Sequence, residues 1–464
     1  MPAALTRFKN LTIMKKRLVS LDAFRGMTIA LMILVNIPGS WSYVYPPFEH
    51  ADWNGCTPTD LVFPFFLFIV GVAMAFSFSK YGYKLNPKSF LRVIERTFLI
   101  FFMGLLLNYY PFFKGILGDG STIEHLFDIL KKLLLSLIPF FAFFWLVKKT
   151  FYIIDRISFS GISKAMKIVY LFLIAIVFVL LVIYLPQLLG YIGFYNKGIS
   201  HLRIMGVLQR IALAFGFSSI LILGFKREYL PYIIAFILLL YWWLMWQFGG
   251  DSPYSLETNF ARQIDLIVFG DNHVWHGKGI PFDPEGLLST LPSIATPMIG
   301  YLIGRYIKDN KQKFGNWFYR LLGYGIVLIV LGQLWNLVFP INKSLWTSSY
   351  VLYTAGLGTL LLSLFYWLID VKGYKKWSSF FIVFGINPLF AFVVHVLWVK
   401  ILLYIVRWEN AEGKISTGYG WLFKNVFQPI AGNMNGSFLF AITHIFFFWL
   451  MLYILYKKKI IIKL

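Results

Sequence analysis

The chain has 464 residues, of which 59% are hydrophobic and 14% are charged. Soluble domains carry about 25% charged residues, so this composition excludes an ordinary soluble protein and predicts that lipid surrounds most of the chain. The net charge of +23 lies in short clusters between apolar runs, which argues against nucleic-acid binding and for positive loops at a membrane surface. The single cysteine, Cys56, excludes an intramolecular disulfide framework and a multi-cysteine metal site.

Apolar runs alternate with short polar connections along the whole chain. A helix that spans a membrane needs about 20 mostly apolar residues. We therefore predict an all-α, polytopic integral membrane protein with about twelve transmembrane helices. The runs, with boundaries loose by several residues, are 18–37, 60–79, 97–110, 133–147, 168–189, 204–224, 229–247, 288–304, 321–339, 349–369, 379–404 and 438–456.

The distribution of charge predicts the orientation. Alternate connections hold 29 of the 43 Lys and Arg residues, and the positive-inside rule places these connections and both termini in the cytoplasm. Of the 20 acidic residues, 14 fall in the outer connections or at their helix starts. We expect a basic cytoplasmic segment at 1–17, a single membrane domain at 18–456 and a basic cytoplasmic tail at 457–464.

Three of the outer connections are long: 38–59, 248–287 and 405–437. Long connections between membrane helices are either functional or simply solvated. The first two are rich in Trp, His, Asp, Asn and Gly, so we expect chemistry there, whereas the third has fewer such groups and is expected to form a cap.

The first predicted helix carries charged and polar residues along its length. Asp22 and Arg25 are three residues apart and share a helical face. Charges inside a span are costly, which favours an anion site; the alternative is an ion pair that reaches the inner surface. Asn36 comes eleven residues after Arg25, or about 16 Å further along the axis. This spacing suits a long ligand with an anionic head at one end and a reactive group at the other.

The next connection contains His50, with Glu49, Asp52 and Asp60 nearby. Histidine exchanges protons near neutral pH, and a carboxylate can orient its ring. The competing interpretations are a solvated loop histidine and, for Asp60, an N-terminal cap of the following helix. Trp53 and Asn54 follow in the same connection.

Buried polar residues recur in later helices and at their ends. Arg210 and Gln209 lie about two turns inside a predicted span, where Arg210 is either a structural clamp or a ligand contact. His395 is either a packed core histidine or part of a site. The spacing of Asp271, His273 and His276 matches no established metal motif, so we predict no metal. The remaining candidates are Asp283 and Glu285 before the run at 288, Asn342, Lys343 and Trp346 before the run at 349, and Asn387 within 379–404.

None of the Walker, GxGxxG, HExxH or GxSxG motifs is present in the sequence. ATP-driven transport, dinucleotide redox chemistry, zinc proteolysis and hydrolase-type catalysis therefore lack their usual signals.

Five segments resemble the heparan-α-glucosaminide N-acetyltransferase family and its bacterial relatives, in the same order along the chain. The segments are LDAFRGMTIALMILVN, HADWNGCTPTDLVFPFFLFIVG, RIMGVLQRIA, FDPEGLLSTLPSI and PINKSLWTSSYVL. Residues 112–200 add an apparent helix pair relative to the family.

The resemblance implies transfer of an acetyl group from cytoplasmic acetyl-CoA to a terminal glucosamine across the membrane. The family histidine matches His50, and its asparagine matches Asn36. In the implied site, Asp60 completes the catalytic group and orients His50 or the sugar. His50 either accepts the acetyl group or acts as a general base, and Asn36 donates a hydrogen bond to the carbonyl oxygen.

The remaining candidates divide into two sets. We expect residues that bind the cofactor and residues that bind the acceptor. The cofactor set, with Arg25 for the phosphates, is Arg25, Gln209, Arg210, Asn387 and His395. The acceptor set is Trp53, Asn54, Asp283, Glu285, Asn342, Lys343 and Trp346.

The resemblance leaves the acceptor and the setting open. The acceptor is an amino sugar, another glycan group or a sugar hydroxyl. A multi-pass location in the bacterial inner membrane with the site toward the periplasm is expected, and the family implies a homodimer. The competing functions are an N-acetylglucosamine-type sugar transporter and a non-catalytic component of a polysaccharide system.

Overall fold

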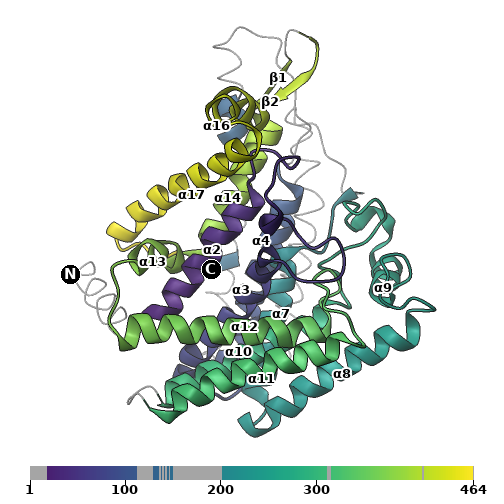
Figure 1. The fold of residues 1–464 in the computed structure, drawn as a ribbon, viewed down its shortest axis with the longest axis vertical. Helices are drawn as coiled ribbons and strands as arrows, with labels where there is room; N and C mark the ends of the chain where they lie inside the picture. Colours follow the sequence, from purple (N-terminus) through teal and green to yellow (C-terminus); the bar gives the residue numbers. More distant parts are fainter. Residues whose placement is uncertain are drawn as a thin grey trace.

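The computed structural model describes most of the membrane domain (Figure 1). The described residues are 18–111, 129–134, 137, 140, 141, 144, 145, 147–149, 201–310, 315–409 and 412–462. The expected segment 1–17, the predicted span 168–189 and most of the inserted pair at 112–200 lie outside this range, and the predicted span 133–147 is described only in part.

The described elements are almost all helical. Short 3-10 and π segments extend or connect the α-helices. The α-helices are α2 (Val19–Asn36), α3 (Val62–Ser77), α4 (Pro87–Tyr109), α7 (Val207–Gly224), α8 (Leu230–Phe248), α9 (Phe260–Phe269), α10 (Thr290–Asn310), α11 (Asn316–Asn336), α12 (Ser348–Phe365), α13 (Ser378–Ile386), α14 (Pro388–Lys400), α15 (Gly418–Leu422), α16 (Gln428–Ala431) and α17 (Asn433–Lys457). The 3-10 segments are η1 (Pro46–Phe48), η2 (Pro58–Leu61), η3 (Phe78–Tyr81), η5 (Arg227–Tyr229) and η6 (Asp271–His273), and the π segments are η7 (Tyr366–Val371), η8 (Ile401–Ile405) and η9 (Phe423–Phe427).

The length and hydropathy of the helices agree with a polytopic membrane protein. Among the described residues, eight helices are long and apolar enough to cross a bilayer. Helices α4 and α10 also match predicted runs but carry more charged or polar residues. The eight spans are Val19–Asn36, Pro58–Tyr81, Val207–Gly224, Arg227–Phe248, Asn316–Asn336, Ser348–Val371, Pro388–Ile405 and Asn433–Lys457.

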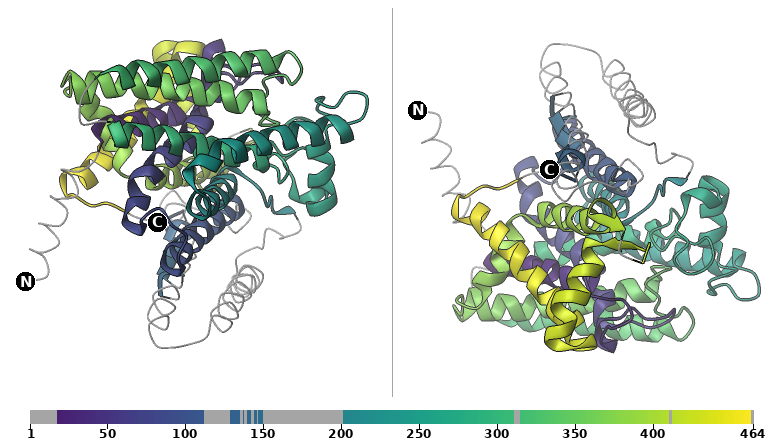
Figure 2. Two further views of the ribbon diagram at one scale, coloured as in Figure 1. Left: turned by 90° about the horizontal axis from the view of Figure 1, so that it is seen from below. Right: turned by 90° about the horizontal axis from the view of Figure 1, so that it is seen from above.

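The core is built from helices that are distant in sequence. Helix α3 packs along α10, α4 along α7, and α11 along α12. Figure 2 shows α11 and α12, in green, running beside each other. The largest hydrophobic cluster joins α2, α3, α4, α7, α10 and α12, so the helices that carry the candidate residues form one packed body.

The predicted single span at 379–404 is wrong, because the chain breaks at Asn387. Helix α13 ends at Ile386, and α14 begins with Pro388; a residue before proline is disfavoured in helical conformation. The backbone of α13 lies directly on α2. A Cβ on Gly26 would come 1.7 Å from the Phe381 carbonyl oxygen, so only glycine permits this approach. Asn387 holds the end of the chain, donating to the Ile460 carbonyl (3.0 Å) and accepting from the Ile462 amide (2.8 Å).

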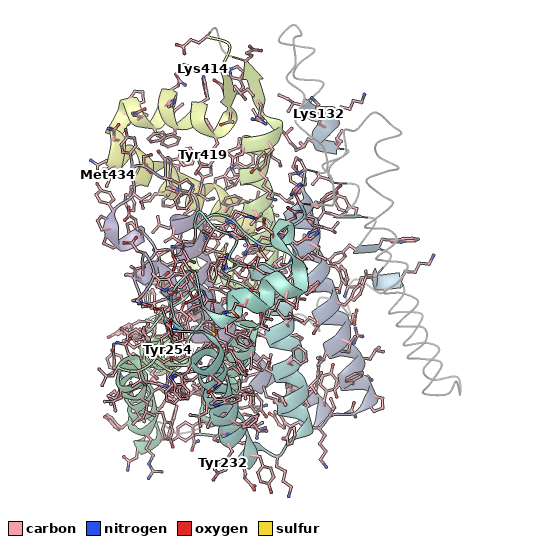
Figure 3. All side chains as sticks on the ribbon, turned by 90° about the vertical axis from the view of Figure 1, so that its right-hand side faces the viewer. Lys132, Tyr232, Tyr254, Lys414, Tyr419 and Met434 are labelled. Atoms are coloured by element: carbon pink, nitrogen blue, oxygen red, sulfur yellow. The ribbon has the colours of Figure 1, made fainter. Side chains whose placement is uncertain are left out.

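Two long connections contain structure of their own. The described part of 405–437 holds an antiparallel pair, β1 (Arg407–Glu409) and β2 (Ile415–Thr417), followed by short helical segments, so the fold is not strictly all-α. In the connection 248–287, α9 and η6 form a small helical layer. Figure 3 places Lys414, beside β2, and Tyr232, in α8, at opposite extremes of the molecule.

Several of the candidate-bearing connections meet at one end of the helices, which we call the loop end. The Gly55 amide donates to the Ile341 carbonyl (2.7 Å), and the Trp53 indole donates to the Tyr254 carbonyl (2.8 Å). These contacts join the connections 38–61, 249–289 and 337–347. Side chains from distant parts of the sequence therefore converge at the loop end.

Candidate active site

The connection that carries His50 is fixed where it enters α3. Thr57 and Asp60 form a capping box around η2: the Asp60 Oδ2 accepts from the Thr57 amide (3.0 Å) and hydroxyl (3.0 Å). It also accepts from the Ala51 amide (3.1 Å). Gly55, with a φ of +109°, supplies a turn that other residues rarely adopt. Two backbone amides that follow His50 in the chain, those of Ala51 and Thr57, are thus bound to one carboxylate.

The other oxygen of that carboxylate holds the imidazole. The His50 Nδ1 lies 2.7 Å from the Asp60 Oδ1, and the Asp60 side chain is 2% exposed. Both earlier interpretations of Asp60 therefore apply, because one oxygen caps the helix and the other orients the histidine. Since an ionised carboxylate only accepts hydrogen bonds, Nδ1 is the donor in this contact, and in the neutral ring the lone pair is then on Nε2. The His50 side chain is 45% exposed, so a substrate can reach it.

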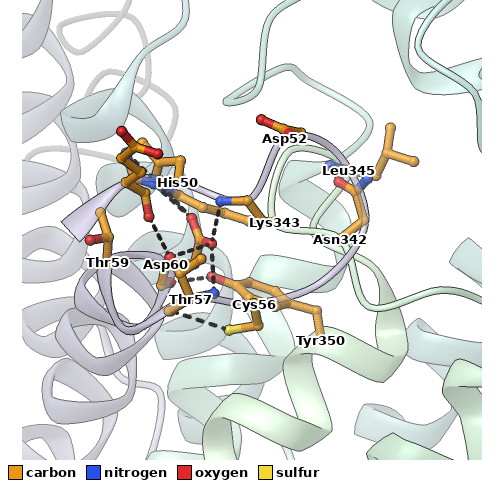
Figure 4. A network of polar contacts seen from close by, with 12 residues as sticks. His50, Asp52, Cys56, Thr57, Thr59, Asp60, Asn342, Lys343, Leu345 and Tyr350 are labelled. Carbon is orange, nitrogen blue, oxygen red and sulfur yellow. Dashed lines mark hydrogen bonds and ion pairs between the residues drawn. The ribbon is translucent and has the colours of Figure 1, made fainter. Parts of the chain in front are cut away.

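Lys343 completes what we call the His50 cluster: His50, Asp60 and Lys343 (Figure 4). Its Nζ lies 3.4 Å from the Asp60 Oδ1, and 3.0 and 3.4 Å from the two ring nitrogens of His50. Burial lowers the pKa of Lys343, and the charges of Asp60 and Glu285 oppose this effect. The cluster places an imidazole, the carboxylate that binds its Nδ1 and a cation within contact of one another.

Tyr350 and Cys56 lie next to the His50 cluster. The Tyr350 hydroxyl donates to the Asp60 carbonyl (2.6 Å). Cys56 lies beside Thr57, and burial, together with the charge of Asp60, raises the pKa of its thiol to about 12. A thiol with this pKa is almost fully protonated at neutral pH, so Cys56 is a poor nucleophile.

The two polar residues at the ends of α2 lie apart from the His50 cluster. The Asn36 carboxamide is exposed and donates to the Met32 carbonyl of its own helix (2.9 Å). No described hydrogen bond joins Asn36 to His50. At the other end, the Arg25 guanidinium contacts Asp22 (3.2 Å) and donates to the Gly385 carbonyl (3.2 Å) of α13. Arg25 thus joins α2 to α13.

A second charged group lies at the loop end. The Arg203 guanidinium binds Asp283 through two hydrogen bonds (2.9 and 2.7 Å) and Glu285 through a third (2.5 Å). Fully buried Arg210 donates to the Gly286 carbonyl (3.3 Å) and the Ser289 hydroxyl. We call Arg203, Arg210, Asp265, Asp283 and Glu285 the Arg203 cluster.

Asp265 is a buried carboxylate of the Arg203 cluster that is bonded through one of its two oxygens. Its Oδ1 accepts from the Leu287 amide (2.7 Å), and its Oδ2 has no hydrogen-bond partner within the described structure. Burial and the charge of Asp283 together raise the pKa of Asp265 to about 7, against the opposing effects of the bond from Leu287 and the charge of Arg210. A proton therefore resides on Asp265 up to near neutral pH.

The segment 337–347 connects the two clusters. The Asn342 carboxamide donates to the Asn54 side chain (3.2 Å) and accepts from the Leu345 amide (2.9 Å). Trp346, buried with a φ of +52°, lies with its ring 5.1 Å from the Arg210 guanidinium carbon. One short segment therefore positions Lys343 in the first cluster and Trp346 beside the second.

The other predicted residues occupy structural positions. Trp53 packs edge-on against Phe282, with the ring centres 5.4 Å apart. Gln209 is buried beside Gly104 on α4. His395 contacts Phe392 and Phe448 and bonds the Phe392 carbonyl (2.9 Å), as a packed core histidine does.

The two histidines of the connection 248–287 bind different partners. His276 pairs with Asp271 (3.1 Å), whereas His273 bonds the Leu202 carbonyl (2.8 Å). Within the part of the chain that the structure describes, no group of three His, Cys, Asp or Glu residues is arranged to hold a metal.

Sequence reasoning missed Arg203 and Asp265 as members of a charged cluster. Arg203 is the first residue of the segment RIMGVLQRIA. Its place within a segment that resembles the family was the available signal. Asp265 lies among apolar residues of α9, and its spacing gave no sign of a partner.

The helices and the loop-end clusters define a polytopic α-helical protein with a polar site in which a histidine is exposed. Comparison with known proteins specifies this class further. Residues 17–185 match the family described as heparan-alpha-glucosaminide N-acetyltransferase, catalytic. This match confirms the resemblance for the first two of the five segments, and the relatives below extend it over nearly the whole chain.

Two curated relatives match nearly the whole chain. The mouse heparan-alpha-glucosaminide N-acetyltransferase is 26% identical over 97% of this chain, and the human protein of the same name is 24% identical over 98% of it. The match covers 60% and 61% of these relatives, so the chain spans about three fifths of their length. Their printed names describe enzymes that transfer acetyl groups to a glucosaminide.

Proposed function

We propose that the protein is a membrane acetyltransferase that moves an acetyl group from acetyl-CoA to an amino sugar, with His50 as the reacting group. The observation that carries the proposal is the exposed imidazole of His50 bonded to buried Asp60 at 2.7 Å. The relatives' names supply the reaction class, and the described geometry supplies a group able to perform it. Acetyl-CoA is the expected acyl donor of such an enzyme.

Two chemical routes use the same imidazole. In one, the Nε2 of His50 attacks the thioester carbon, a C–N bond forms, and the C–S bond breaks to release the thiolate of CoA. The acceptor amine then attacks the acetyl carbon, the bond from that carbon to Nε2 breaks, and the amine proton passes to the freed Nε2. In the other, Nε2 removes a proton from the amine as the amine attacks the thioester carbon, and the C–S bond breaks to release CoA, whose sulfur takes up that proton. In both routes the Asp60 carboxylate stabilises positive charge on the ring through Nδ1.

The spacing of α2 supports a donor that reaches across the protein. Arg25 and Asn36 lie near opposite ends of this helix, about 16 Å apart along its axis. We assign Arg25 to the anionic end of the donor and Asn36 to the approach to His50. Gln209, Arg210, Asn387 and His395 are assigned to the walls and supports of this path.

The acceptor approaches from the loop end. Exposed Asn54 and half-buried Trp53 border this face and offer polar and aromatic groups of the kind that bind sugars. Buried Asn342, Asp283 and Glu285 support the segments around them. The positive-inside pattern supports a loop end that faces the exterior, which would be the periplasm of a bacterial inner membrane. A homodimer is the assembly we infer from the family.

The proposal is tested with purified protein, radiolabelled acetyl-CoA and glucosamine-type acceptors. We expect labelled N-acetyl product from the wild type and a loss of about 10³-fold or more in His50→Ala. His276→Ala is the matched control, because His276 is also an exposed histidine paired with an aspartate. Equal activity in His50→Ala and the wild type would refute the assignment of His50. Sugar uptake into proteoliposomes without acetylation would favour a transporter instead.

A further inference from the structure

Lys343 is held in place by the backbone around it. The Gly55 amide binds the Ile341 carbonyl (2.7 Å), the Asn342 amide donates to the Thr347 hydroxyl (3.1 Å), and the Leu345 amide donates to the Asn342 side chain (2.9 Å). These bonds secure the segment on both sides of Lys343. Its ammonium therefore reaches His50 from a rigid support rather than from a free loop.

The contacts of the Lys343 ammonium leave a donor available at the open side of the cluster. An ammonium has three N–H donors, and one is directed at the Asp60 Oδ1 (3.4 Å). The Nδ1 of His50, 3.0 Å away, already donates to Asp60 and cannot accept. Nζ also lies 3.4 Å from Nε2, so a second donor is directed at this nitrogen and a third stays available. The Lys343 side chain is 22% exposed, so this side of the cluster is accessible.

We propose that the Lys343 ammonium stabilises the oxyanion that forms during acyl transfer. This inference rests on the proposed function. When a nucleophile attacks the thioester carbon, the C=O π pair moves onto the carbonyl oxygen, and it returns when the C–S bond breaks. An acyl group bonded to Nε2 carries this oxygen two bonds from the nitrogen that Nζ approaches to 3.4 Å. A cation at that position favours the charged intermediate over the neutral thioester.

Other candidate donors are engaged elsewhere. Asn36 donates to Met32, and Lys278 donates to the Asp52 carbonyl (2.7 Å). Arg210 bonds groups of the Arg203 cluster. Within the described structure, Lys343 is the cationic side chain that contacts the His50 ring. Burial lowers the pKa of Lys343, and a more acidic ammonium is a stronger hydrogen-bond donor.

The test compares steady-state kinetics of Lys343→Met with those of the wild type. Removal of one oxyanion donor costs about 10²–10³ in kcat, so we expect a fall of that size with a KM for acetyl-CoA within a few-fold of the wild type. Lys278→Met is the matched control, since Lys278 is a lysine of the same face that bonds only a backbone carbonyl in the described contacts, and it should keep wild-type kcat. An unchanged kcat in folded Lys343→Met, or a raised KM alone, would overturn the inference.

Chemical rescue separates a charge at this position from a structural role. In Lys343→Ala, added methylammonium or ethylammonium should restore kcat by at least about tenfold with saturation, whereas a purely structural lysine would give no rescue. Folding of each variant is checked by its thermal unfolding. His50→Ala is assayed in parallel: wild-type transfer that is lost in His50→Ala but retained in Lys343→Met would refute only the role of Lys343. Absence of transfer by the wild type would refute the proposed function and this inference together.

Discussion

The two charged clusters at the loop end contain similar groups but differ in what they leave available. In the His50 cluster, a buried carboxylate positions a ring that is 45% exposed. In the Arg203 cluster, Arg203 is bound by two carboxylates, and Arg210 is fully buried. The first arrangement leaves an imidazole accessible to solvent, whereas the second keeps its carboxylates and Arg210 away from solvent.

This difference indicates separate roles. A paired and buried arginine contributes to the architecture, because leaving its carboxylates without a partner is costly. An oriented but exposed histidine contributes little to packing and is suited to chemistry. We therefore expect mutations in the Arg203 cluster to act mainly on stability and mutations in the His50 cluster to act mainly on kcat.

The largest stability effect is expected for Arg203→Met. The change leaves Asp283 and Glu285 without their partner, and Asp283 is 1% exposed in its side chain. Breaking such a pair costs about 3–5 kcal/mol, measured as the change in the free energy of unfolding in detergent. Arg227→Met removes an ion pair whose side chains are 42% and 41% exposed, so it should cost less than about 1 kcal/mol. Equal losses in the two variants would contradict the distinction.

Asp60→Asn should reduce activity more than stability. An amide has one acceptor oxygen, so it cannot both cap η2 and orient His50 as the carboxylate does. We expect kcat to fall by about 10²–10³, with a smaller loss of unfolding free energy. Asp271→Asn alters the exposed pair with His276 (3.1 Å) and should leave kcat unchanged. A normal kcat in folded Asp60→Asn would show that the orientation of His50 is unimportant.

The pH dependence of the unfolding free energy tests the contribution of the Arg203 cluster to stability. The folded protein raises the pKa of Asp265 to about 7, whereas an unfolded aspartate has a value of about 3.9. The proton is thus bound more tightly in the folded state. The contribution of Asp265 to the unfolding free energy is therefore fully present below pH about 4 and is lost as the pH rises through about 7.

Asp265→Asn, which resembles the protonated acid, isolates this contribution. Between pH 4 and 7 we expect the unfolding free energy of the wild type to fall relative to the variant by about 3 kcal/mol, since the pKa shift is about 3 units and each unit corresponds to about 1.4 kcal/mol. Parallel stability curves for the two proteins would show that Asp265 does not titrate in this range.

Much of the fold follows from hydropathy, but its irregularities do not. The runs that became α2, α3, α7, α8 and α12 were predicted, because long apolar segments have few alternatives in a membrane. The break at Asn387 was missed because hydropathy does not register where the backbone turns, although the following Pro388 was a signal. The exact number of spans and their orientation stay predictions.

The candidate site could be predicted only where its members are close in sequence or fall in recognised segments. His50 and Asp60 are ten residues apart, and a histidine near carboxylates suggested the pairing. Lys343 was expected to bind the acceptor; its contact with His50 spans 293 positions, and no local pattern encodes such a contact. Asp265 was missed because its altered pKa arises from burial by elements that pack onto α9 only in the folded protein.

The most direct test of acyl transfer through His50 is an assay in sealed proteoliposomes. Radiolabelled acetyl-CoA is placed on the side of the basic connections, and a glucosamine-type acceptor is placed on the side of the loop end. The account predicts labelled N-acetyl product on the acceptor side with the wild type and a loss of at least about 10³-fold with folded His50→Gln. Undiminished product formation by His50→Gln would contradict the central claim.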